Sequence, residues 1–420
     1  MLSFSNQLSV FATFVDIIPD EMTKSLAREE RATRPVNVDG GAAMKPTPAI
    51  ANALDSARAG AVLEAEALPL ALLVDEFARR APAITASHWD RVQARCAASG
   101  PAPAELIAEA RASDGGKHTR PRLVAAAFFG MGGTDTALLA EVAGAQQLLH
   151  LGLCMHDDII DGDRVRHGRP NIVARYTAAG LLEGLTETAA ERQAMTAALL
   201  AGDLAINAAM LALLEAPAPA AVQRRLAAEA SAALETTIAG EFLDVRSELL
   251  RPDASEPLLV AELKTAAYSV VLPLRLGAVA SDAATHAELE CLQQVGIAFG
   301  IAYQLADDEL GLFGAAEATG KSVLSDVQQG KRTEHVRLAY HRADPAGRAL
   351  LDAILGDPAA TEADAAAIRD FVTRTGARAA VARAIDEHVA RGIRLAEAGL
   401  PDRLAAYLTD LAHSLRGRTS

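Results

Sequence analysis

The chain has few cysteines and few aromatic residues. Only three of its 420 residues are cysteines, and Cys96, Cys154 and Cys291 are widely spaced without a metal-ligand pattern. Such a sparse, odd set argues against a disulfide framework and favours a reducing compartment, so we expect a cytoplasmic protein. Aromatic residues make up 4% of the chain, while alanine and leucine recur throughout at the expense of β-branched residues. This balance predicts helix over strand and an all-α protein.

Positive charge is also scarce. The chain contains 40 Lys and Arg against 54 Asp and Glu, which gives a formal net charge of −14. Most of the surface should repel polyanions, so no nucleic acid is expected as a partner. The N-terminus lacks a basic leader followed by an apolar stretch, which argues against a signal peptide. Apolar stretches such as Leu68 to Val74 are much shorter than the roughly 20 residues of a membrane span, so no transmembrane segment is expected.

The sequence divides into two parts of different character. Residues 1–60 hold scattered Pro, Gly and charged residues without a sustained period, and we predict a poorly ordered N-terminal extension there. From residue 61 to 420, apolar residues recur at helical spacing between short breaks, which predicts a single all-helical domain. A turn is expected at Asp114-Gly115-Gly116, directly before Lys117.

One apolar segment, beginning at Leu148, ends in three aspartates: Asp157, Asp158 and Asp161. On a helix, the side chains of Asp157 and Asp161 lie about 40° apart and one turn along the axis, so both carboxylates can chelate one hard cation. Carboxylates this close repel each other unless a cation or a proton compensates. Taken alone, the cluster is equally consistent with a solvated acidic helix end.

A second acidic cluster changes this interpretation. Asp307, Asp308 and Glu309 again follow an apolar helical segment, which begins near Val295. Two such clusters suggest opposed metal-binding walls with a diphosphate between them, because Mg²⁺ is usually held by a few carboxylates together with substrate phosphates. Basic residues that could contact a diphosphate follow the turn and both clusters: Lys117, Arg120, Arg166, Lys264, Lys321 and Lys331.

In this order the motifs resemble those of the trans-prenyl diphosphate synthases. The matching blocks are GGKHTRP at 115–121, DDIID at 157–161, KT at 264–265, Gln304 with Asp307-Asp308, and GKRT at 330–333. The resemblance extends from about residue 70 to the C-terminus. It implies a single large bundle of helices around a central cavity, of the isoprenoid synthase type. It also implies that the protein forms a homodimer. The implied activity is condensation of isopentenyl diphosphate with an allylic diphosphate, with two or three Mg²⁺ ions bridged by substrate diphosphate.

The resemblance also implies roles for individual residues. Magnesium would be bound by Asp157, Asp161 and Asp307, with Asp158, Asp308 and Lys264 completing the catalytic set. The allylic diphosphate would be held by Arg166, Lys264, Thr265, Gln304, Lys321 and Lys331. Isopentenyl diphosphate would be held by Lys117, Arg120, His150 and His167. The block GEFLD at 240–244 precedes the lysine, and its Asp244 is expected to orient Lys264 or a metal-bound water.

Two positions depart from the family pattern. His167 stands where a second arginine is common, which weakens one isopentenyl diphosphate contact, and Gly311 stands at the fifth position of the second cluster in place of aspartate. Product length is expected to depend on the side chains that form the floor of the pocket one to two turns before Asp157, here Gly152 and Leu153. Neither is a bulky aromatic residue, which predicts a product longer than C15, with C20 expected.

Several alternatives remain open from the sequence. A terpene cyclase-like enzyme would ionise a prenyl diphosphate without condensing it, but it has no need for Lys117, Arg120 and His150. A catalytically weak partner subunit would account for His167 and Gly311, although both acidic clusters are retained. A purely structural helical protein would not explain the ordered motifs. His150 and His156 can each be read as histidines of the core.

Overall fold

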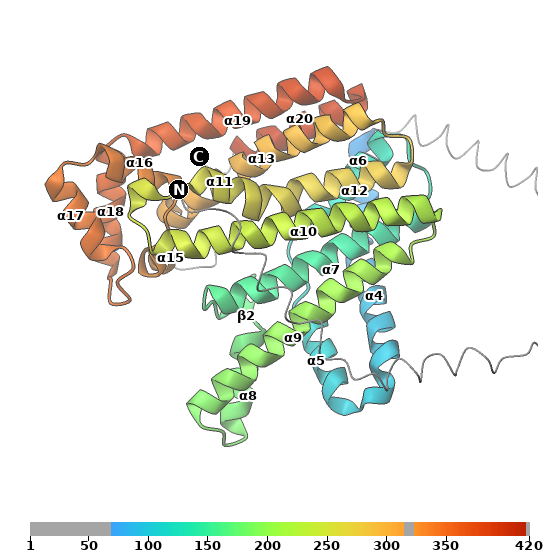
Figure 1. Cartoon of the computed structure of the whole chain (residues 1–420), viewed down its shortest axis with the longest axis horizontal. Helices are drawn as coiled ribbons and strands as arrows, with labels where there is room; N and C mark the ends of the chain where they lie inside the picture. Colours follow the sequence, from blue (N-terminus) through green and yellow to red (C-terminus); the bar gives the residue numbers. More distant parts are fainter. Residues whose placement is uncertain (1–68, 315–322, 417–420) are drawn as a thin grey trace, which may run out of the picture. The chain divides into compact units, whose positions relative to one another are not determined.

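The computed structural model describes residues 69–314 and 323–416. In these ranges the regular secondary structure is helical apart from one hairpin of two short strands, which confirms the all-α prediction (Figure 1). The elements of the first half are α3 (Leu70–Ala78), α4 (Ala81–Cys96), α5 (Pro101–Ala112), α6 (Thr119–Gly130), α7 (Thr136–Ile160), β1 (Val165–Arg166), β2 (Arg169–Pro170), α8 (Ile172–Leu182), α9 (Glu187–Leu214) and α10 (Ala220–Glu248). The predicted extension 1–60 lies outside the described residues.

The second half continues the helical pattern. Its elements are α11 (Pro257–Val260), the π-helix η3 (Ala261–Val271), α12 (Leu272–Ser281), α13 (His286–Phe313), α15 (Val323–Gln329), α16 (Glu334–Arg342), α17 (Pro345–Ile354), α18 (Glu362–Arg374), α19 (Ala377–Gly399) and α20 (Asp402–Arg416). In Figure 1, α10, α12, α13 and α19 run alongside one another, and α7 runs beside α9. Three short connections, Ala97–Ser99, Pro252–Ala254 and the turn before α6, separate longer helices. The turn expected at 114–116 lies between α5 and α6, as predicted.

Side-chain caps fix where the site-bearing helices begin. The carboxylate of Asp135 accepts hydrogen bonds from the amides of Ala137 and Leu138 and starts α7. Thr285 and Glu288 form a capping box that starts α13. These contacts satisfy amides that lack a partner within the helix. Each helix then runs without a break to an acidic cluster in its last turns.

Two glycines set the close crossing of α7 and α9. A Cβ atom on Gly152 would lie 2.8 Å from the carbonyl oxygen of Gly202 and 2.7 Å from Cγ1 of Ile206. Real Cβ atoms do not come this close to other atoms, so the two backbones can approach only because glycine has no side chain. The expectation that Gly152 forms the floor of an open product pocket is therefore wrong, because α9 already fills the space at this position.

The π-helix η3 is held between two neighbouring helices. A Cβ atom on Gly240 of α10 would collide with the backbone of Lys264, and one on Gly300 of α13 would collide with Ala266. Both glycines therefore let η3 lie in backbone contact with α10 and α13. π-helical turns are rare, and those that occur are often found at functional sites. In this chain, η3 contains the adjacent residues Lys264 and Thr265.

Residues from α13 to α18 form a second, smaller core. Its buried members include Leu312, Val327, Tyr340, Leu351 and Ile368. This core anchors α15 and the residues that follow it, so it fixes where Lys331 lies. The three cysteines are all free, in agreement with the prediction that they form no disulfide.

Three helical stretches correct the expectation about membrane-spanning length. Among the described residues, Thr136–Ile160, Glu187–Leu214 and Pro257–Ser281 are long and apolar enough, by length and composition, to cross a membrane. Polar residues interrupt the apolar runs in the sequence without interrupting the helices, so the runs counted from the sequence are shorter than the helical stretches. Of their most apolar windows, 72%, 50% and 44% of the residues respectively are buried inside the protein.

Candidate active site

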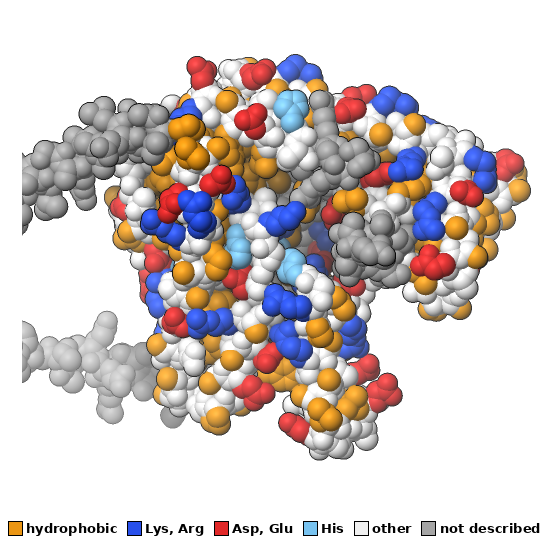
Figure 2. Space-filling model, turned by 180° about the vertical axis from the view of Figure 1, so that it is seen from behind, with side chains coloured by type: hydrophobic (Ala, Val, Ile, Leu, Met, Phe, Trp, Pro, Cys, Tyr) orange, Lys and Arg blue, Asp and Glu red, His pale blue; other side chains and the backbone are white. Residues whose placement is uncertain are grey.

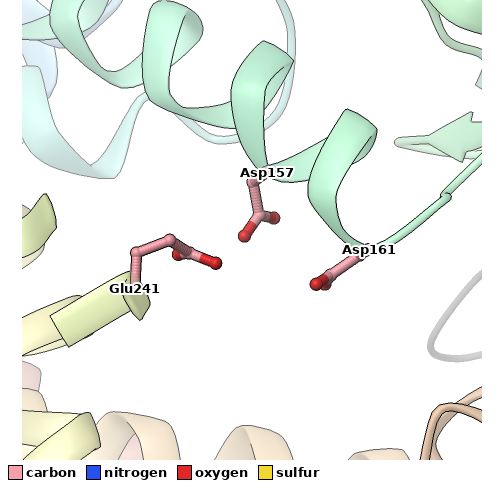
Figure 3. A group of neighbouring side chains, drawn as sticks. All are labelled: Asp157, Asp161 and Glu241. Carbon is pink, nitrogen blue, oxygen red and sulfur yellow. The ribbon is translucent and has the colours of Figure 1, made fainter. Parts of the chain in front are cut away.

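Three carboxylates converge at the end of α7. Asp157 lies in the last turn of this helix, Asp161 caps it, and Glu241 reaches them from α10 (Figure 3). Each residue offers one oxygen, and these oxygens all lie within 4.8 Å of one another. Such a group of hard oxygen ligands fits a divalent cation such as Mg²⁺. The sequence placed Asp157 and Asp161 together, but it gave no role to Glu241, whose only signal was the block at 240–244.

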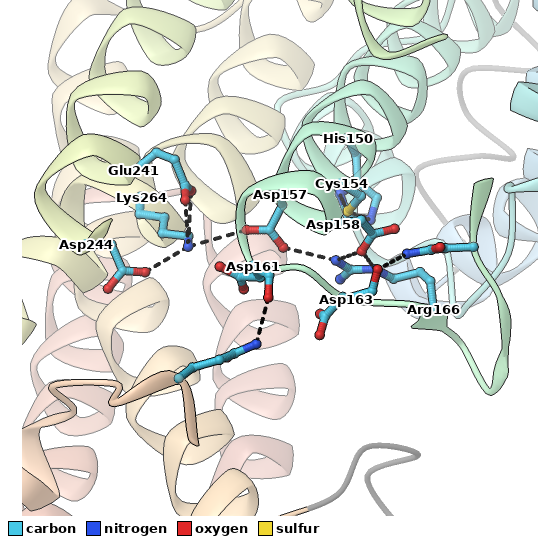
Figure 4. A network of polar contacts seen from close by, with 12 residues as sticks. His150, Cys154, Asp157, Asp158, Asp161, Asp163, Arg166, Glu241, Asp244 and Lys264 are labelled. Carbon is cyan, nitrogen blue, oxygen red and sulfur yellow. Dashed lines mark hydrogen bonds and ion pairs between the residues drawn. The ribbon is translucent and has the colours of Figure 1, made fainter. Parts of the chain in front are cut away.

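The aspartates at the end of α7, together with Glu241, form the first acidic wall of the site. Lys264 lies among these carboxylates (Figure 4). Its Nζ atom is 3.3 Å from Oδ1 of Asp157, 3.0 Å from Oε2 of Glu241 and 2.8 Å from Oδ2 of Asp244. The contact with Asp244 agrees with the expectation that Asp244 orients the lysine. Burial opposes protonation of Lys264, but the negative charges of Asp157, Asp244 and Glu241 more than offset it and hold the pKa of the ammonium above its usual value.

Two further cations neutralise the same wall. Arg166 in β1 donates from NH2 to Oδ2 of Asp157 at 3.0 Å and from Nε to Oδ1 of Asp158 at 2.9 Å. Lys331, which follows α15, donates to Oδ2 of Asp161 at 3.1 Å. Such charge-assisted hydrogen bonds are roughly twice as strong as neutral ones. The structure thus brings Arg166 and Lys331 to the aspartates predicted to share their diphosphate.

These cations divide the acids into two protonation states. Burial raises the pKa of Asp157, but Lys264 and Arg166 outweigh it, so the pKa lies below the usual value. Burial raises the pKa of Glu241 to about 7, and the negative charges of Asp157 and Asp244 act in the same direction while Lys264 opposes them. Without a further cation, Asp157 is therefore ionised at neutral pH and Glu241 is partly protonated.

The second acidic wall, formed by Asp307 and Asp308 on α13, is connected to the first through η3. The hydroxyl of Thr265 donates to Oε1 of Gln304 at 2.6 Å, and Nε2 of Gln304 donates to Oδ1 of Asp308 at 2.7 Å. Because Thr265 follows Lys264 directly, a continuous chain of contacts joins Asp157 to Asp308. Burial, together with nearby acidic side chains, raises the pKa of Asp308 to about 8. Asp307, beside it, is exposed.

A buried brace lies behind the second wall. Glu309 accepts a hydrogen bond at 2.7 Å from Nε of Arg378 in α19, and its other oxygen lies 2.8 Å from Nε2 of His335 in α16. The guanidinium of Arg378 stacks over the ring of Phe313 at 3.9 Å. Sequence reasoning missed this cluster, since these residues are far apart in the chain and only folding brings them together.

The predicted isopentenyl diphosphate residues lie around α6. Lys117 is exposed in the turn before this helix. Arg120 lies 3.2 Å from Nε2 of His150 and donates to the hydroxyl of Ser269 at 2.8 Å and to that of Tyr268 at 3.3 Å. Burial and the charge of Arg120 hold the pKa of His150 well below its usual range, so the ring is neutral. Sequence reasoning missed Tyr268 and Ser269, although both follow the KT block in η3.

His167 lies in the turn of the β1–β2 hairpin, in the left-handed backbone region with φ +53°. Its ring packs against the turn before α6, because a Cβ atom on Gly116 would lie 3.0 Å from its Cε1 atom. His156, by contrast, faces α9, where Nε2 lies 3.1 Å from the carbonyl oxygen of Leu199. The side chain of His156 is therefore packed against α9 but is only partly buried. Lys321 lies outside the described residues.

A narrow cleft opens beside the first wall. Its lining combines polar side chains of the site with apolar ones from α7, α8 and α9, and includes His150, Cys154, Met155, Asp158, Arg166, His167, Val173 and Ala198. Figure 2 shows Lys and Arg side chains, with histidines among them, across the middle of one face of the molecule. In an acidic chain, this local concentration of positive charge favours an anionic ligand.

An all-helical bundle that brings two aspartate clusters and a set of cationic side chains together defines the isoprenoid synthase type of enzyme. The polyprenyl synthetase family model matches residues 104–372. A (2E,6E)-farnesyl diphosphate synthase of Mycobacterium tuberculosis is 33% identical over 310 residues, covering 72% of this chain and 80% of the relative. A nonaprenyl diphosphate synthase of the same species is 30% identical over 312 residues, covering 72% and 84%.

Solved structures agree with these sequence relatives. The crystal structure of a geranylgeranyl pyrophosphate synthase from Corynebacterium glutamicum, complexed with isoprenyl diphosphate and magnesium, matches with a TM-score of 0.76 at 26% identity. The match covers 82% of this chain and 99% of that one. This chain therefore belongs to the polyprenyl synthetase family and is a trans-prenyl diphosphate synthase, a prenyltransferase of isoprenoid biosynthesis. The relatives differ in product, so family membership does not fix the length of the chain that this enzyme makes.

Proposed function

We propose that this enzyme condenses isopentenyl diphosphate with an allylic diphosphate to give geranylgeranyl diphosphate, the C20 product. The observation that carries the proposal is the convergence of Asp157, Asp161 and Glu241 within chelating distance of one another, directly beside the ammonium of Lys264. Carboxylates and cations interleaved in this way suit a ligand that is itself a metal-bound anion.

Asp157 and Asp161 on the first wall, and Asp307 on the second, hold two or three Mg²⁺ ions in this proposal, with Asp158 and Asp308 in support. Glu241 adds a third carboxylate oxygen to the first wall. Magnesium held by these carboxylates would supply stabilisation of the negative charge on the departing diphosphate.

Lys264, Arg166 and Lys331 bind the allylic diphosphate. In this structure each of them already contacts an aspartate of the first wall, so phosphate oxygens need only replace or join those contacts. Thr265 and Gln304 hold the opposite side, where they are bonded to each other. Lys321 is assigned to the same diphosphate on the resemblance alone.

Isopentenyl diphosphate binds to Lys117, Arg120, His150 and His167. Its diphosphate stays intact while its double bond attacks the ionised allylic carbon, so these residues act by binding and orientation. The neutral ring of His150 leaves Arg120 free of a competing cation, and Tyr268 and Ser269 fix the direction of the guanidinium. The proton lost after attack goes to the released diphosphate, and no protein nucleophile is required.

The product length depends on Leu153, which lies one turn before Asp157 on the same side of α7. Leucine leaves more room than an aromatic ring would, which favours C20 over C15. Leu153→Phe should shift the products toward C15, whereas Leu153→Ala should leave C20 or extend it. An identical product distribution in both variants would place the limit elsewhere.

We also propose a homodimer formed through α9 and α10. Ile238, Phe242 and Val245 are exposed on α10 at a spacing that puts them on one side of the helix, and Met195 and Leu199 are exposed on α9. Covering these apolar side chains with a second copy removes them from water. Ile238→Glu should shift the protein toward monomer in light-scattering measurements after gel filtration. Asp370→Lys, an exposed position on α18, should not.

The proposed reaction is tested with purified enzyme, Mg²⁺, labelled isopentenyl diphosphate and one allylic primer at a time. Sizing the dephosphorylated products should show a C20 chain. Release of a hydrocarbon without elongation would indicate a cyclase, and no turnover by the pure protein would support a partner-subunit role. A protein without residues 1–60 should keep its activity if residues 61–420 form the catalytic domain. We further propose that the enzyme is cytoplasmic.

A further inference from the structure

The second wall lacks one carboxylate that the first wall has. Asp157 and Asp161 are four residues apart, which places them on the same side of α7. The matching partner of Asp307 on α13 would be residue 311, which is glycine. Counted along its own helix, the second wall therefore offers fewer oxygens to a cation than the first.

A side chain from another helix occupies the vacant position. Oδ2 of Asp326, in α15, lies directly against Gly311, and its Cγ atom is 3.6 Å from the point where a Cβ atom of residue 311 would be. A side chain at 311 would collide with this carboxylate unless Asp326 turned away from its present position. Gly311 and Asp326 thus fit each other: the glycine leaves the space, and the aspartate places a carboxyl group in it.

The same aspartate is also connected to the first wall through Lys331. The amide of Lys331 donates to the backbone carbonyl of Asp326 at 3.0 Å, and its Nζ atom bonds Asp161 at 3.1 Å. Asp326 therefore belongs to the turn that joins the second wall to the first.

We infer that Asp326 supplies, from α15, the carboxylate that Gly311 removes from α13, and that it holds the magnesium–diphosphate complex at the second wall together with Asp307. The inference rests on the proposed magnesium-dependent function, since it assigns a further residue to the same site. It also assigns α15 a role in substrate binding, because a shift of this short helix moves Asp326 and Lys331 together.

The inference is tested by calorimetric titration of the full chain with inorganic diphosphate at a series of Mg²⁺ concentrations, a readout that requires no turnover. Asp326→Asn keeps the size of the side chain but removes its charge. It should raise the Mg²⁺ concentration for half-maximal diphosphate binding by about tenfold or more, as loss of a metal-supporting carboxylate typically does. Gln328→Ala is the matched control on α15, because Nε2 of Gln328 donates to the carbonyls of Pro358 and Ala360, near the start of α18. It should leave the Mg²⁺ dependence unchanged.

A transposed pair gives the sharper test. Asp326→Gly should weaken binding as Asp326→Asn does, and Gly311→Asp alone should lower the melting temperature, because the two carboxylates would collide. Combining Gly311→Asp with Asp326→Gly moves the carboxylate back to α13 and should restore the Mg²⁺ dependence to within about threefold of the wild type.

Two results would overturn the inference: an unchanged Mg²⁺ dependence in Asp326→Asn, or a double variant no better than Asp326→Gly. Either can occur in an enzyme that still elongates prenyl chains, which leaves the proposed function intact. Conversely, a protein that binds diphosphate with Mg²⁺ and responds to the variants as expected, but makes no C20 product, supports the role of Asp326 while contradicting the proposed product.

Discussion

The two acidic walls of this enzyme are built differently. On the first wall, Asp157 contacts Lys264 and Arg166, and Asp161 contacts Lys331. On the second wall, Asp308 accepts a hydrogen bond from the neutral amide of Gln304. Asp157 of the first wall is therefore ionised before any ligand arrives, because Lys264 and Arg166 already balance its charge.

The second wall is not balanced in this way. The pKa of Asp308 is about 8, so this carboxyl group is largely protonated at neutral pH, and Glu309 is turned away into the brace with His335 and Arg378. A bound divalent cation would favour the ionised form of Asp308. The comparison indicates that the first wall is preformed for cations, whereas the second gains its charge when cations bind.

The largest effect is expected from the first wall. Asp157→Ala removes a carboxylate that contacts both Lys264 and Arg166, and kcat should fall by about 10³-fold, as for loss of a strong electrostatic group at a reacting centre. Initial rates at saturating Mg²⁺ measure this. Asp203→Asn, an exposed acid on α9, is the control and should retain its rate. A loss below tenfold in Asp157→Ala would remove the first wall from the chemistry.

The brace behind the second wall should matter for stability. Glu309→Gln leaves the buried ring of His335 and the guanidinium of Arg378 without their shared carboxylate, and breaking such a pair costs about 3 kcal/mol of unfolding free energy. Urea denaturation measures this cost. Glu288→Gln, which weakens the capping box at the start of α13, should cost about 1 kcal/mol or less and is the comparison for surface changes on the same helix. Equal losses in the two variants would contradict the brace.

The protonation of Asp308 makes the metal-free enzyme sensitive to pH. Its pKa is raised from about 3.9 in an unfolded chain to about 8 in the fold. Between these values the folded state binds more protons, so stability falls as pH rises, with a slope of about 1.4 kcal/mol per pH unit from this group. Denaturation without Mg²⁺ at pH 6 and pH 8 should show this fall in the free energy of unfolding. In Asp308→Asn, the slope of that free energy against pH should be smaller by the equivalent of about one proton. The decrease remaining in that variant comes in part from Glu241, whose pKa is about 7. An unchanged slope in Asp308→Asn would assign the proton to another group.

The smallest effect is expected at the edge of the first wall. His167→Arg restores the second arginine that is common in the family, and it should lower the KM for isopentenyl diphosphate by about threefold, the size of one exposed charged contact. The allylic KM should not change. His341→Arg, far along the chain in α16, serves as the control. An unchanged or higher KM for isopentenyl diphosphate would contradict the role of His167.

Much of the site was readable from local patterns. The four-residue spacing of Asp157 and Asp161 predicts their shared cation site because helical geometry alone puts them on one side. The turn before Lys117 and the pair Lys264-Thr265 are likewise read from consecutive residues. In the structure, the turn lies between α5 and α6 and the pair lies in η3. In contrast, Gly152 was misjudged as a pocket floor, since only the position of α9 shows that Ile206 and Gly202 already fill that space.

The amino-acid sequence by itself determined the helical class, the family and the residues proposed to bind metal and diphosphate, because each of these depends on spacing within one helix or one short block. Tertiary structure alone decided that Glu241 joins the first wall, that Glu309 turns back to His335 and Arg378, and that Asp326 fills the space at Gly311. Those contacts join helices far apart in the chain, and no local period encodes how such helices pack.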